Sequence, residues 1–357
     1  MIISRTPFRI SFFGGGTDYP AWYRQHGGAV LAATINKYCY LTCRYLPPFF
    51  EHRLRVVYSK IETCQKAKEI QHPSARETLR FLKIERGIEV HHDGDLPGRS
   101  GMGSSSAFTV GLLNALYALQ GRVVGKKQLA SESIHIEQNI LQELVGSQDQ
   151  VCAAYGGLNR ISFLPNGEFS VLPLTLTHGR MEELNAHLLL FYTGIKRTAA
   201  TVATSFVPNI TERSTLLNQM RDSVDEGCDI LNGTGDLTPF GKLLHDAWLA
   251  KRGLSDQISN DQVDSAYAAA RSAGALGGKL LGAGGGGFLL VFASPSKHAR
   301  IKEQLNRLIH VPFKFEFSGS QIIFFDLGED YSAQDKAREG QQIEAFRELT
   351  PNSPGAS

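Results

Sequence analysis

The most constraining feature of this chain is a glycine- and serine-rich segment that runs into an apolar stretch, residues 96–119, with the sequence LPGRSGMGSSSAFTVGLLNALYAL. The pattern predicts a loop that ends at a helix N-terminus. Such a loop leaves backbone N–H groups unpaired at the positive end of the helix dipole, and glycines let a ligand approach them closely. The favoured ligand is an anion, most often phosphate. Serines at a helix start can also cap these N–H groups themselves, so this loop alone leaves both interpretations open.

Composition restricts the class of protein. The chain has 357 residues, 42% of them hydrophobic and 20% charged, which is typical of a soluble globular protein of one large or two smaller domains. A net charge of +2 argues against nucleic acid or a membrane surface as the partner. We find no signal-peptide stretch and no membrane-length apolar run. The five cysteines lack zinc-site spacing, so we interpret them as reduced thiols and expect a cytoplasmic protein.

Hydrophobic periodicity predicts an α+β chain. The N-terminal part reads as strands at 2–13, 29–44, 53–59 and 87–91, with helices at 74–86, 106–120 and 127–143. The pattern then predicts a hairpin at 159–172, a buried strand at 187–192 and helices over 198–273. A strand, a helix and two more strands follow and end at 326. We therefore predict domains at 1–185 and 186–328, and a C-terminal tail at 329–357.

A second glycine run, residues 282–287, follows a helix and precedes an apolar strand. It satisfies the dinucleotide-binding spacing, but that motif must follow a strand and open a helix, so we reject it. Leu280 stands where a P-loop needs Ser or Thr, so we reject that motif as well. Because each glycine costs backbone entropy, we expect this run to pack closely against the first glycine loop or a nucleotide.

The chain contains each part that magnesium-dependent phosphoryl transfer requires. Residues 101–106 are the candidate phosphate cradle, and Ser104 or Ser105 with Glu137 would supply a hydroxyl and a carboxylate for the metal. Arg9 is the candidate cation and Asp149 the candidate base. Asp149 directly precedes an apolar run. A carboxylate beside buried residues needs a partner, and Arg9 would supply one.

Three separated blocks now carry a specific resemblance. RTPFRISFFGGGTDYP at 5–20, PGRSGMGSSSAF at 97–108 and KLLGAGGGGF at 279–288 resemble the three ordered motifs of the GHMP small-molecule kinases, over residues 1–326. The resemblance implies a ribosomal protein S5 domain 2-like N-terminal domain and a ferredoxin-like C-terminal domain. It also implies ATP as cofactor, with its phosphates wrapped by Pro97, Gly98, Gly101, Met102, Gly103, Ser104, Ser105 and Ser106.

The same resemblance suggests a role for each site residue. Arg9 matches the arginine that stabilises charge near the attacking hydroxyl, and Asp149 the proposed base. Glu137 matches the helix glutamate on Mg²⁺, with Ser104 or Ser105 as its hydroxyl partner. Galactokinase-like members carry Gly-Glu-His-Thr-Asp, whereas this chain has GGGTD, so the galactose contacts are missing and galactokinase activity is not expected. Substrate binding falls to Gly15, Gly16, Thr17 and Asp18.

GGGTD, GSQDQ and TGIKR are similar to the D-glycero-D-manno-heptose 7-phosphate kinases, which act at the anomeric oxygen on the route to nucleotide-activated heptose. A sugar phosphate would need extra positive charge. The candidates are Lys196, Arg197, Lys279 and Arg99, with Gly284 and Gly285 beside them. Two alternatives stay open, a kinase for fucose or an octose phosphate, and a non-catalytic sugar and ATP sensor. We expect a monomer or homodimer.

Overall fold

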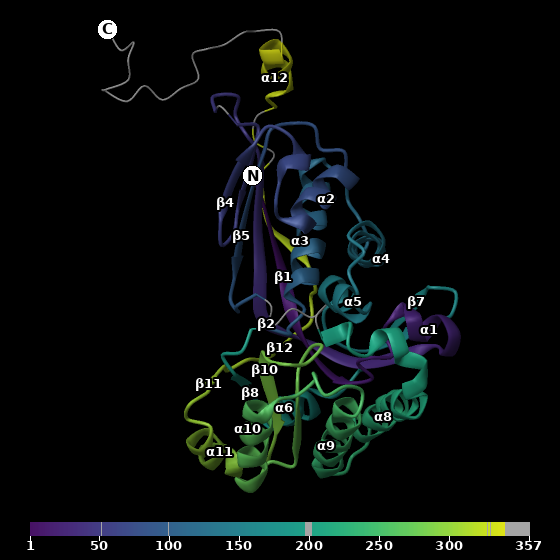
Figure 1. Cartoon of the computed structure of the whole chain (residues 1–357). Coiled ribbons are helices and arrows are strands. Elements are labelled where there is room, and N and C mark those ends of the chain that lie inside the picture. The colour runs from purple at the N-terminus through teal and green to yellow at the C-terminus, as the bar shows by residue number, and fades with distance from the viewer. Residues whose placement is uncertain (51, 99, 197–201, 327, 329, 340–357) are drawn as a thin grey trace.

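The computed structural model describes residues 1–50, 52–98, 100–196, 202–326, 328 and 330–339. Figure 1 shows an elongated molecule, with a long sheet backed by helices at one end and a smaller sheet packed among helices at the other. The two parts meet where the lower ends of the longest strands reach the smaller sheet. The described chain is thus a mixed α and β fold with two sheets.

The larger sheet has nine strands among the described residues, mostly antiparallel, in the order β13-β1-β2-β5-β3-β4, with β12, β6 and β7 attached through β2. Alternating and β-branched residues explain the long central strands, whose pairing runs from Ile2 opposite Cys43 to Phe13 opposite Leu31. The strands are β1 (Ile2–Phe13), β2 (Gly28–Tyr45), β3 (Leu54–Val57), β4 (Ile61–Cys64), β5 (Ile88–Gly94), β6 (Leu158–Phe163), β7 (Phe169–Pro173), β12 (Phe315–Glu316) and β13 (Gln321–Phe325).

Helices cover one face of this sheet (Figure 1). The central helix, α3 (Ser104–Leu119), is apolar on nearly every side and is therefore buried all round, against the strands and the neighbouring helices. Its neighbours are α2 (Pro73–Phe81), α4 (Lys126–Ile134), a π-helical turn at His135–Ile140 and α5 (Gln148–Tyr155), with a 3₁₀ turn at Ala67–Glu69.

The smaller sheet has the order β11-β8-β10-β9. Its central strand β10 is completely buried, as its run of apolar residues predicts. The strands are β8 (Leu188–Tyr192), β9 (Gly277–Leu280), β10 (Phe288–Phe292) and β11 (Ile309–His310). The helices are α1 (Pro20–His26), α6 (His178–Ala186), α8 (Ser214–Asn232), α9 (Thr238–Arg252), α10 (Asp261–Ser272), α11 (His298–Gln304) and α12 (Ser332–Glu339), with 3₁₀ turns at Val207–Arg213 and Pro295–Lys297.

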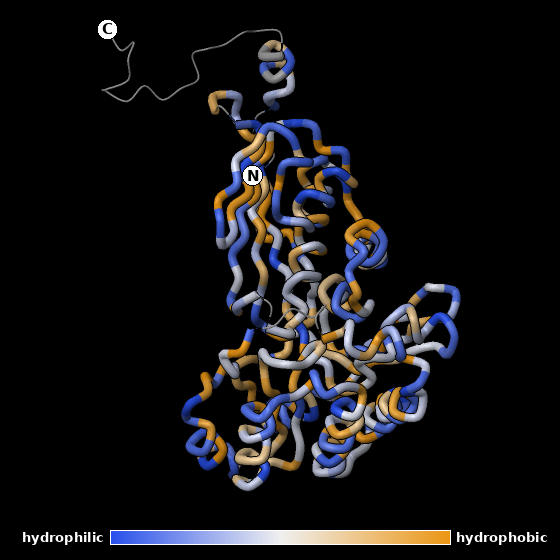
Figure 2. The backbone as a smooth tube through the Cα atoms, in the orientation of Figure 1, coloured by the Kyte–Doolittle hydropathy of each residue, from blue (hydrophilic) through white to orange (hydrophobic). Residues whose placement is uncertain are grey.

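Both halves of the chain contribute to each part of the molecule. Strand β13 pairs with β1, with Ile2 opposite Phe325, so the last strands of the chain return to the first sheet. In the other direction, Tyr19 and Trp22 pack with residues of α8 and α9 in the second core. A division at residue 185 therefore follows neither the sheets nor the cores. Figure 2 shows hydrophobic residues running along the strands and alternating with hydrophilic residues on the outer helices.

Several predicted elements differ in extent. The predicted helix at 127–143 ends as α4 at Ile134 and continues only as the π-helical turn. Helix α1, Pro20–His26, falls between the predicted strands at 2–13 and 29–44, where no helix was predicted. The start of the predicted helical stretch, 198–201, lies outside the described residues. All five cysteines are free, as expected. Among the described helices, none is long and apolar enough to cross a membrane.

Candidate active site

Arg9 and Asp149 form a partly buried ion pair between the middle of β1 and the first turn of α5. Nε and Nη2 of Arg9 each donate to one carboxylate oxygen of Asp149 at 2.8 Å, and Nη1 donates to the Gly101 carbonyl at 2.6 Å. Burial alone would lower the pKa of Arg9, but the charge and hydrogen bonds of Asp149 raise it overall. The Asp149 side chain stays 25% exposed and the Arg9 side chain only 4%. The pairing predicted from the neighbourhood of Asp149 is present, and a quarter of the Asp149 side chain stays exposed.

The glycine-rich loop before α3 lies directly on this ion pair. Gly101 and Gly103 have φ angles of +79° and +74°, in the left-handed region that favours glycine. Gly103 is the N-cap of α3 and supplies no side-chain cap. A Cβ on Gly103 would lie 3.4 Å from Cγ of Arg9 and of Asp149. The start of α3, where an anion is favoured, therefore adjoins the ion pair.

The other loop residues support this geometry in different ways. Met102 is buried, and its carbonyl accepts from the Arg9 backbone N–H at 3.2 Å. Ser100 Oγ donates to the Pro97 carbonyl at 2.6 Å and so closes the loop. Gly98 has open space around it. Arg99 lies outside the described residues.

Glu137 is fully buried beside the same helix. Its Oε2 accepts from Ser106 Oγ at 2.9 Å and from Gln150 Nε2 at 2.6 Å, and the Thr109 hydroxyl also interacts with the carboxylate. Oε1 is buried and has no partner at hydrogen-bond geometry among the described residues. Burial raises the pKa of Glu137 to about 7. Ser106 is thus the serine that contacts Glu137, while Ser104 and Ser105 form the first turn of α3, half-buried and exposed respectively. Glu137 sits in the π-helical turn, a distortion common at functional sites.

Asp18 is a second buried carboxylate close to Asp149. Its Oδ1 accepts from the Gly16 N–H at 2.9 Å, and its Oδ2 accepts from the Gln148 N–H at 3.3 Å and from Gln148 Nε2 at 3.0 Å. Burial raises the pKa of Asp18, and the negative charge of Asp149 adds to that effect. Gly146 packs so closely that a Cβ there would lie 1.9 Å from Oδ2. Gly146 and Gln148, at the start of α5, therefore hold Asp18 beside Asp149.

The residues before Asp18 shape a tight turn. Thr17 Oγ1 lies 2.8 Å from the Gly14 carbonyl and 2.9 Å from the Ala29 carbonyl, and it accepts from the Ala29 N–H at 3.1 Å. These main-chain bonds occupy the hydroxyl that we assigned to substrate. Gly16, at φ +117°, faces Leu217 of α8, and Gly15 lies against Gln148. This turn joins β1 to the second core.

The predicted phosphate-binding cations lie in different environments. Lys279 is 2% exposed within β9, and its Nζ donates to the Phe12 carbonyl at 2.9 Å. Burial lowers its pKa well below the ordinary lysine value. Lys196 is exposed, and Arg197 lies outside the described residues. Lys279 therefore ties β9 to the end of β1, which does not favour the phosphate contact expected of it.

The two glycine loops pack against each other, as expected for the second run. A Cβ on Gly282 would lie 2.5 Å from the Gly101 Cα, and one on Gly287 would lie 2.1 Å from the Ser100 carbonyl oxygen. Gly285 N–H donates to the Ile258 carbonyl at 2.8 Å, and a Cβ on Gly284 would also meet Ile258. Gly284 and Gly285, predicted to bind substrate, thus pack on the segment after α9.

Lys251 is a buried cation near the site that sequence reasoning missed. It is 6% exposed, and its Nζ donates to the Leu280 carbonyl at 3.2 Å and to the Gly282 carbonyl. Burial lowers its pKa to about 7, and the positive charge of Arg9 adds to that effect. One signal was available, because Lys251 falls at helical spacing on the apolar stripe of α9 that includes Ala247 and Trp248.

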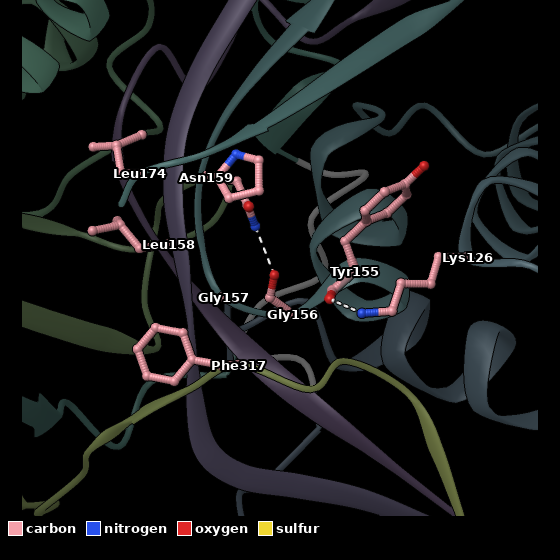
Figure 3. A pocket seen from close by; sticks show the side chains of 9 residues that line it. Lys126, Tyr155, Gly156, Gly157, Leu158, Asn159, Leu174 and Phe317 are labelled. Carbon is pink, nitrogen blue, oxygen red and sulfur yellow. Dashed lines mark hydrogen bonds between the residues drawn. The ribbon is translucent and has the colours of Figure 1, made fainter. Parts of the chain in front are cut away.

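A separate hollow of about 210 Å³ lies at the far end of α5 from Asp149, between that helix end and the β6–β7 hairpin. Figure 3 shows that Asn159 donates to the Gly156 carbonyl and Lys126 to the Tyr155 carbonyl there, at 2.7 Å each. The described residues that line it include no carboxylate. These residues therefore do not supply the carboxylate that phosphoryl transfer requires.

Comparison with known proteins identifies the family. Residues 67–157 match the GHMP kinases N terminal domain, and residues 228–310 match the GHMP kinases C terminal domain. A D-glycero-alpha-D-manno-heptose 7-phosphate kinase of Campylobacter jejuni is 27% identical over 322 residues, 86% of this chain and 93% of that protein. An L-fucokinase/L-fucose-1-P guanylyltransferase of Bacteroides fragilis is 27% identical over 350 residues, 85% of this chain and 36% of that protein.

The fold agrees with these matches. A crystal structure described as a D-glycero-D-manno-heptose 1-phosphate kinase from Bacteroides thetaiotaomicron superimposes with a TM-score of 0.75 at 23% identity, over 91% of this chain and all of that one. The chain therefore carries the N-terminal and C-terminal domains of the GHMP kinases, in that order, and is an ATP-dependent phosphotransferase. The α+β fold expected from the three motifs is confirmed.

Proposed function

We propose that this enzyme transfers the γ-phosphoryl group of ATP to the anomeric C1 hydroxyl of D-glycero-D-manno-heptose 7-phosphate, giving the 1,7-bisphosphate. The similarity to the Campylobacter jejuni heptose 7-phosphate kinase, over most of both chains, supports this acceptor. The observation that carries the chemistry is the position of the Arg9–Asp149 pair against Gly103, the N-cap of α3. A phosphate bound at that helix start lies beside a carboxylate and a guanidinium.

Asp149 and Arg9 have distinct roles in the proposed reaction. The C1 oxygen attacks the γ-phosphorus, the bond from the γ-phosphorus to the ADP oxygen breaks, and the hydroxyl proton passes to Asp149. Asp149 keeps lone pairs beyond those that Arg9 occupies, and a quarter of its side chain is exposed. Arg9 uses three of its five N–H donors within the described part of the chain. Its remaining donors can stabilise charge on the transferred group.

We assign Mg²⁺ to Glu137 together with a hydroxyl from the first turn of α3, Ser104 or Ser105. The buried Glu137 Oε1, which lacks a hydrogen-bond partner among the described residues, fits an oxygen ligand for a hard cation. No cluster of three His, Cys, Asp or Glu side chains able to hold a metal occurs in the described ranges. The ion would therefore take further ligands from ATP and water, and when bound it neutralises charge on the β- and γ-phosphates.

The acceptor is proposed to lie between Asp18 and Asp149. Oδ2 of Asp18 already accepts two hydrogen bonds, but Oδ1 accepts only one among the described residues and keeps a lone pair that can receive a sugar hydroxyl. We assign the 7-phosphate to the Lys196–Arg197 segment, because Lys279 is buried on a carbonyl. Replacement of Lys196 by Ala is expected to raise KM for the phosphorylated sugar and to leave KM for ATP unchanged.

The test is ADP release with Mg²⁺ and a panel that includes heptose 7-phosphate, unphosphorylated heptose, an octose phosphate, fucose and galactose, with phosphorus NMR of the product. We expect the highest kcat/KM for heptose 7-phosphate and a new anomeric phosphate signal. Faster turnover of another sugar overturns the assigned acceptor. ATP binding without turnover of any sugar would support the sensor alternative.

Fucose is the second candidate acceptor. It is favoured by similarity to a Bacteroides fragilis fucokinase, and to the bifunctional fucokinase/GDP-fucose pyrophosphorylase of Arabidopsis thaliana at 24% identity over 82% of this chain. The Lys196 variant separates the two candidates. Loss of a phosphate contact should not change turnover of fucose, which carries no phosphate.

A further inference from the structure

We propose that Lys251 is a positioning residue for phosphoryl transfer, which acts on Arg9 through the two glycine loops. The proposal rests on the kinase function above and adds a residue from the C-terminal part of the chain to its site. Lys251 lies in the last turn of α9, outside all three motif blocks.

The route from Lys251 to the reacting groups consists of direct contacts. Lys251 Nζ donates to the Gly282 carbonyl, and Gly282 packs on Gly101 without room for a Cβ on either residue. The Gly101 carbonyl accepts from Arg9 Nη1 at 2.6 Å, and Arg9 holds both oxygens of Asp149. A shift of the second glycine loop would therefore be passed to the carboxylate that receives the acceptor hydroxyl.

Burial of the Lys251 side chain costs free energy that an apolar side chain in a purely structural role would not cost. A lysine that is 6% exposed loses most of its hydration, and an apolar side chain of similar length would fill the same space at lower cost. Its bonds to the Leu280 and Gly282 carbonyls hold the strand end and the loop together. A methionine could pack there but could not donate to either carbonyl.

The surrounding charges connect Lys251 with the same site. Asp18 and Asp149 attract its ammonium group, while Arg9 repels it. Lys279 lies close enough for the two ammonium groups to repel each other, but it bonds to the Phe12 carbonyl and to neither glycine loop. Of these two buried lysines, only Lys251 contacts the loop that packs on Gly101.

The test compares Lys251→Met with Lys242→Met, an exposed lysine on the same helix. Loss of the tether should lower kcat about 10- to 100-fold, because small misplacements at a reacting centre have effects of that size. KM for ATP and for the sugar should change less than about threefold, and Lys251→Arg should recover part of kcat. Lys242→Met should match the wild type.

A double-mutant cycle with Arg9→Lys distinguishes positioning from a general effect. If Lys251 acts through Arg9, the loss of kcat caused by Arg9→Lys is smaller in the Lys251→Met background. If each substitution lowers kcat by the same factor in both backgrounds, the proposal is overturned. A Lys251→Met enzyme with normal kcat overturns it as well. If the Met variant does not fold, Lys251→Gln enters the same cycle.

A readout without catalysis keeps this inference separate from the assigned function. Hydrogen–deuterium exchange of residues 100–106 and 281–287 should be at least several-fold faster in Lys251→Met than in Lys242→Met, because the loops lose their tether. Unchanged exchange overturns the tether even if no sugar in the panel is phosphorylated. Absence of turnover by the wild type contradicts only the proposed function.

Discussion

Gly101, in the first third of the chain, and Gly282, in the last third, pack backbone to backbone, so that a Cβ on Gly282 would lie 2.5 Å from the Gly101 Cα. Both residues have positive φ angles, +79° and +70°. Any side chain at either position would separate the loops as well as strain the backbone. The contact holds the glycine-rich loop before α3 on the C-terminal part of the molecule.

Gly101→Ala should therefore weaken both stability and ATP binding. Its Cβ would lie 2.6 Å from the Leu281 carbonyl oxygen, at a φ that alanine disfavours. We expect a loss of about 1–3 kcal/mol in the free energy of unfolding, and an ATP Kd raised about tenfold or more, measured by denaturant titration and calorimetry. Gly98→Ala is the matched control for stability, since open space surrounds Gly98 in the same loop. Equal stability of the two variants would contradict the prediction.

Asp149→Asn tests the base. Loss of the proton acceptor should lower kcat by about 10²- to 10⁴-fold and leave the Kd for ATP nearly unchanged. Steady-state kinetics and calorimetry measure the two quantities. Asp225→Asn is the control, because Asp225 also pairs with an arginine, Arg160 at 2.7 Å, but is exposed. Near-normal turnover of Asp149→Asn would remove Asp149 from the chemistry.

Glu137→Gln tests the metal assignment. The amide can stay within reach of Ser106 and Gln150 but is a weaker ligand for Mg²⁺ than a carboxylate. We expect the Mg²⁺ concentration needed for half-maximal activity to rise at least tenfold, because one anionic ligand is lost. In EDTA at pH 8 the melting temperature should not fall, because the buried charge is removed. Glu132→Gln, on the preceding helix α4, should keep the wild-type Mg²⁺ requirement.

Local pattern predicted much of the fold, and long-range packing decided the rest. Alternation along residues 2–13 was enough to place β1 with the bounds that the structure has. Helix α1 was missed because its seven residues begin at Pro20 inside a turn-like sequence, and its aromatic residues show their role only against the second core. Lys279 was expected at a phosphate because an ammonium group pairs well with phosphate oxygens, yet pairing in β9 buries it.

In the candidate site, too, local sequence pattern predicted some contacts, and long-range packing decided the others. Pairing of Arg9 with Asp149 followed from the physical need of a carboxylate beside apolar residues. The contact of Ser106 with Glu137 could not be told from a contact of its neighbours, because the choice depends on the rotation of α3 against the π-helical turn. The roles of these residues in catalysis stay predictions.

Acid sensitivity of the fold should depend in part on His72. Burial lowers its pKa to about 4, and the positive charge of His92 adds to that effect. Unfolded histidine titrates near 6.5, so between pH 6.5 and 4 the unfolded chain binds a proton that the folded chain does not. Stability is therefore lost as the pH falls through that window.

His72→Asn removes this titration and keeps an acceptor for the Ala75 N–H at the start of α2. The variant loses the stacking of His72 on Phe108, which lowers stability at every pH. The drop in melting temperature from pH 7.5 to pH 5 should be smaller than in the wild type. His178→Asn, at an exposed position, should keep the wild-type difference. An identical drop in the His72 variant would contradict the prediction.

The return of β13 to β1 has a consequence for synthesis on the ribosome. Strand β1 is made first, but its edge is covered only when Gln321–Phe325 has left the exit tunnel. Until then the nascent N-terminal sheet exposes unpaired backbone N–H and C=O groups, which other chains can recruit. Strand β13, made last, thus covers the edge of β1, made first. A chain stalled before residue 321 should therefore bind chaperones more strongly than the full-length chain does.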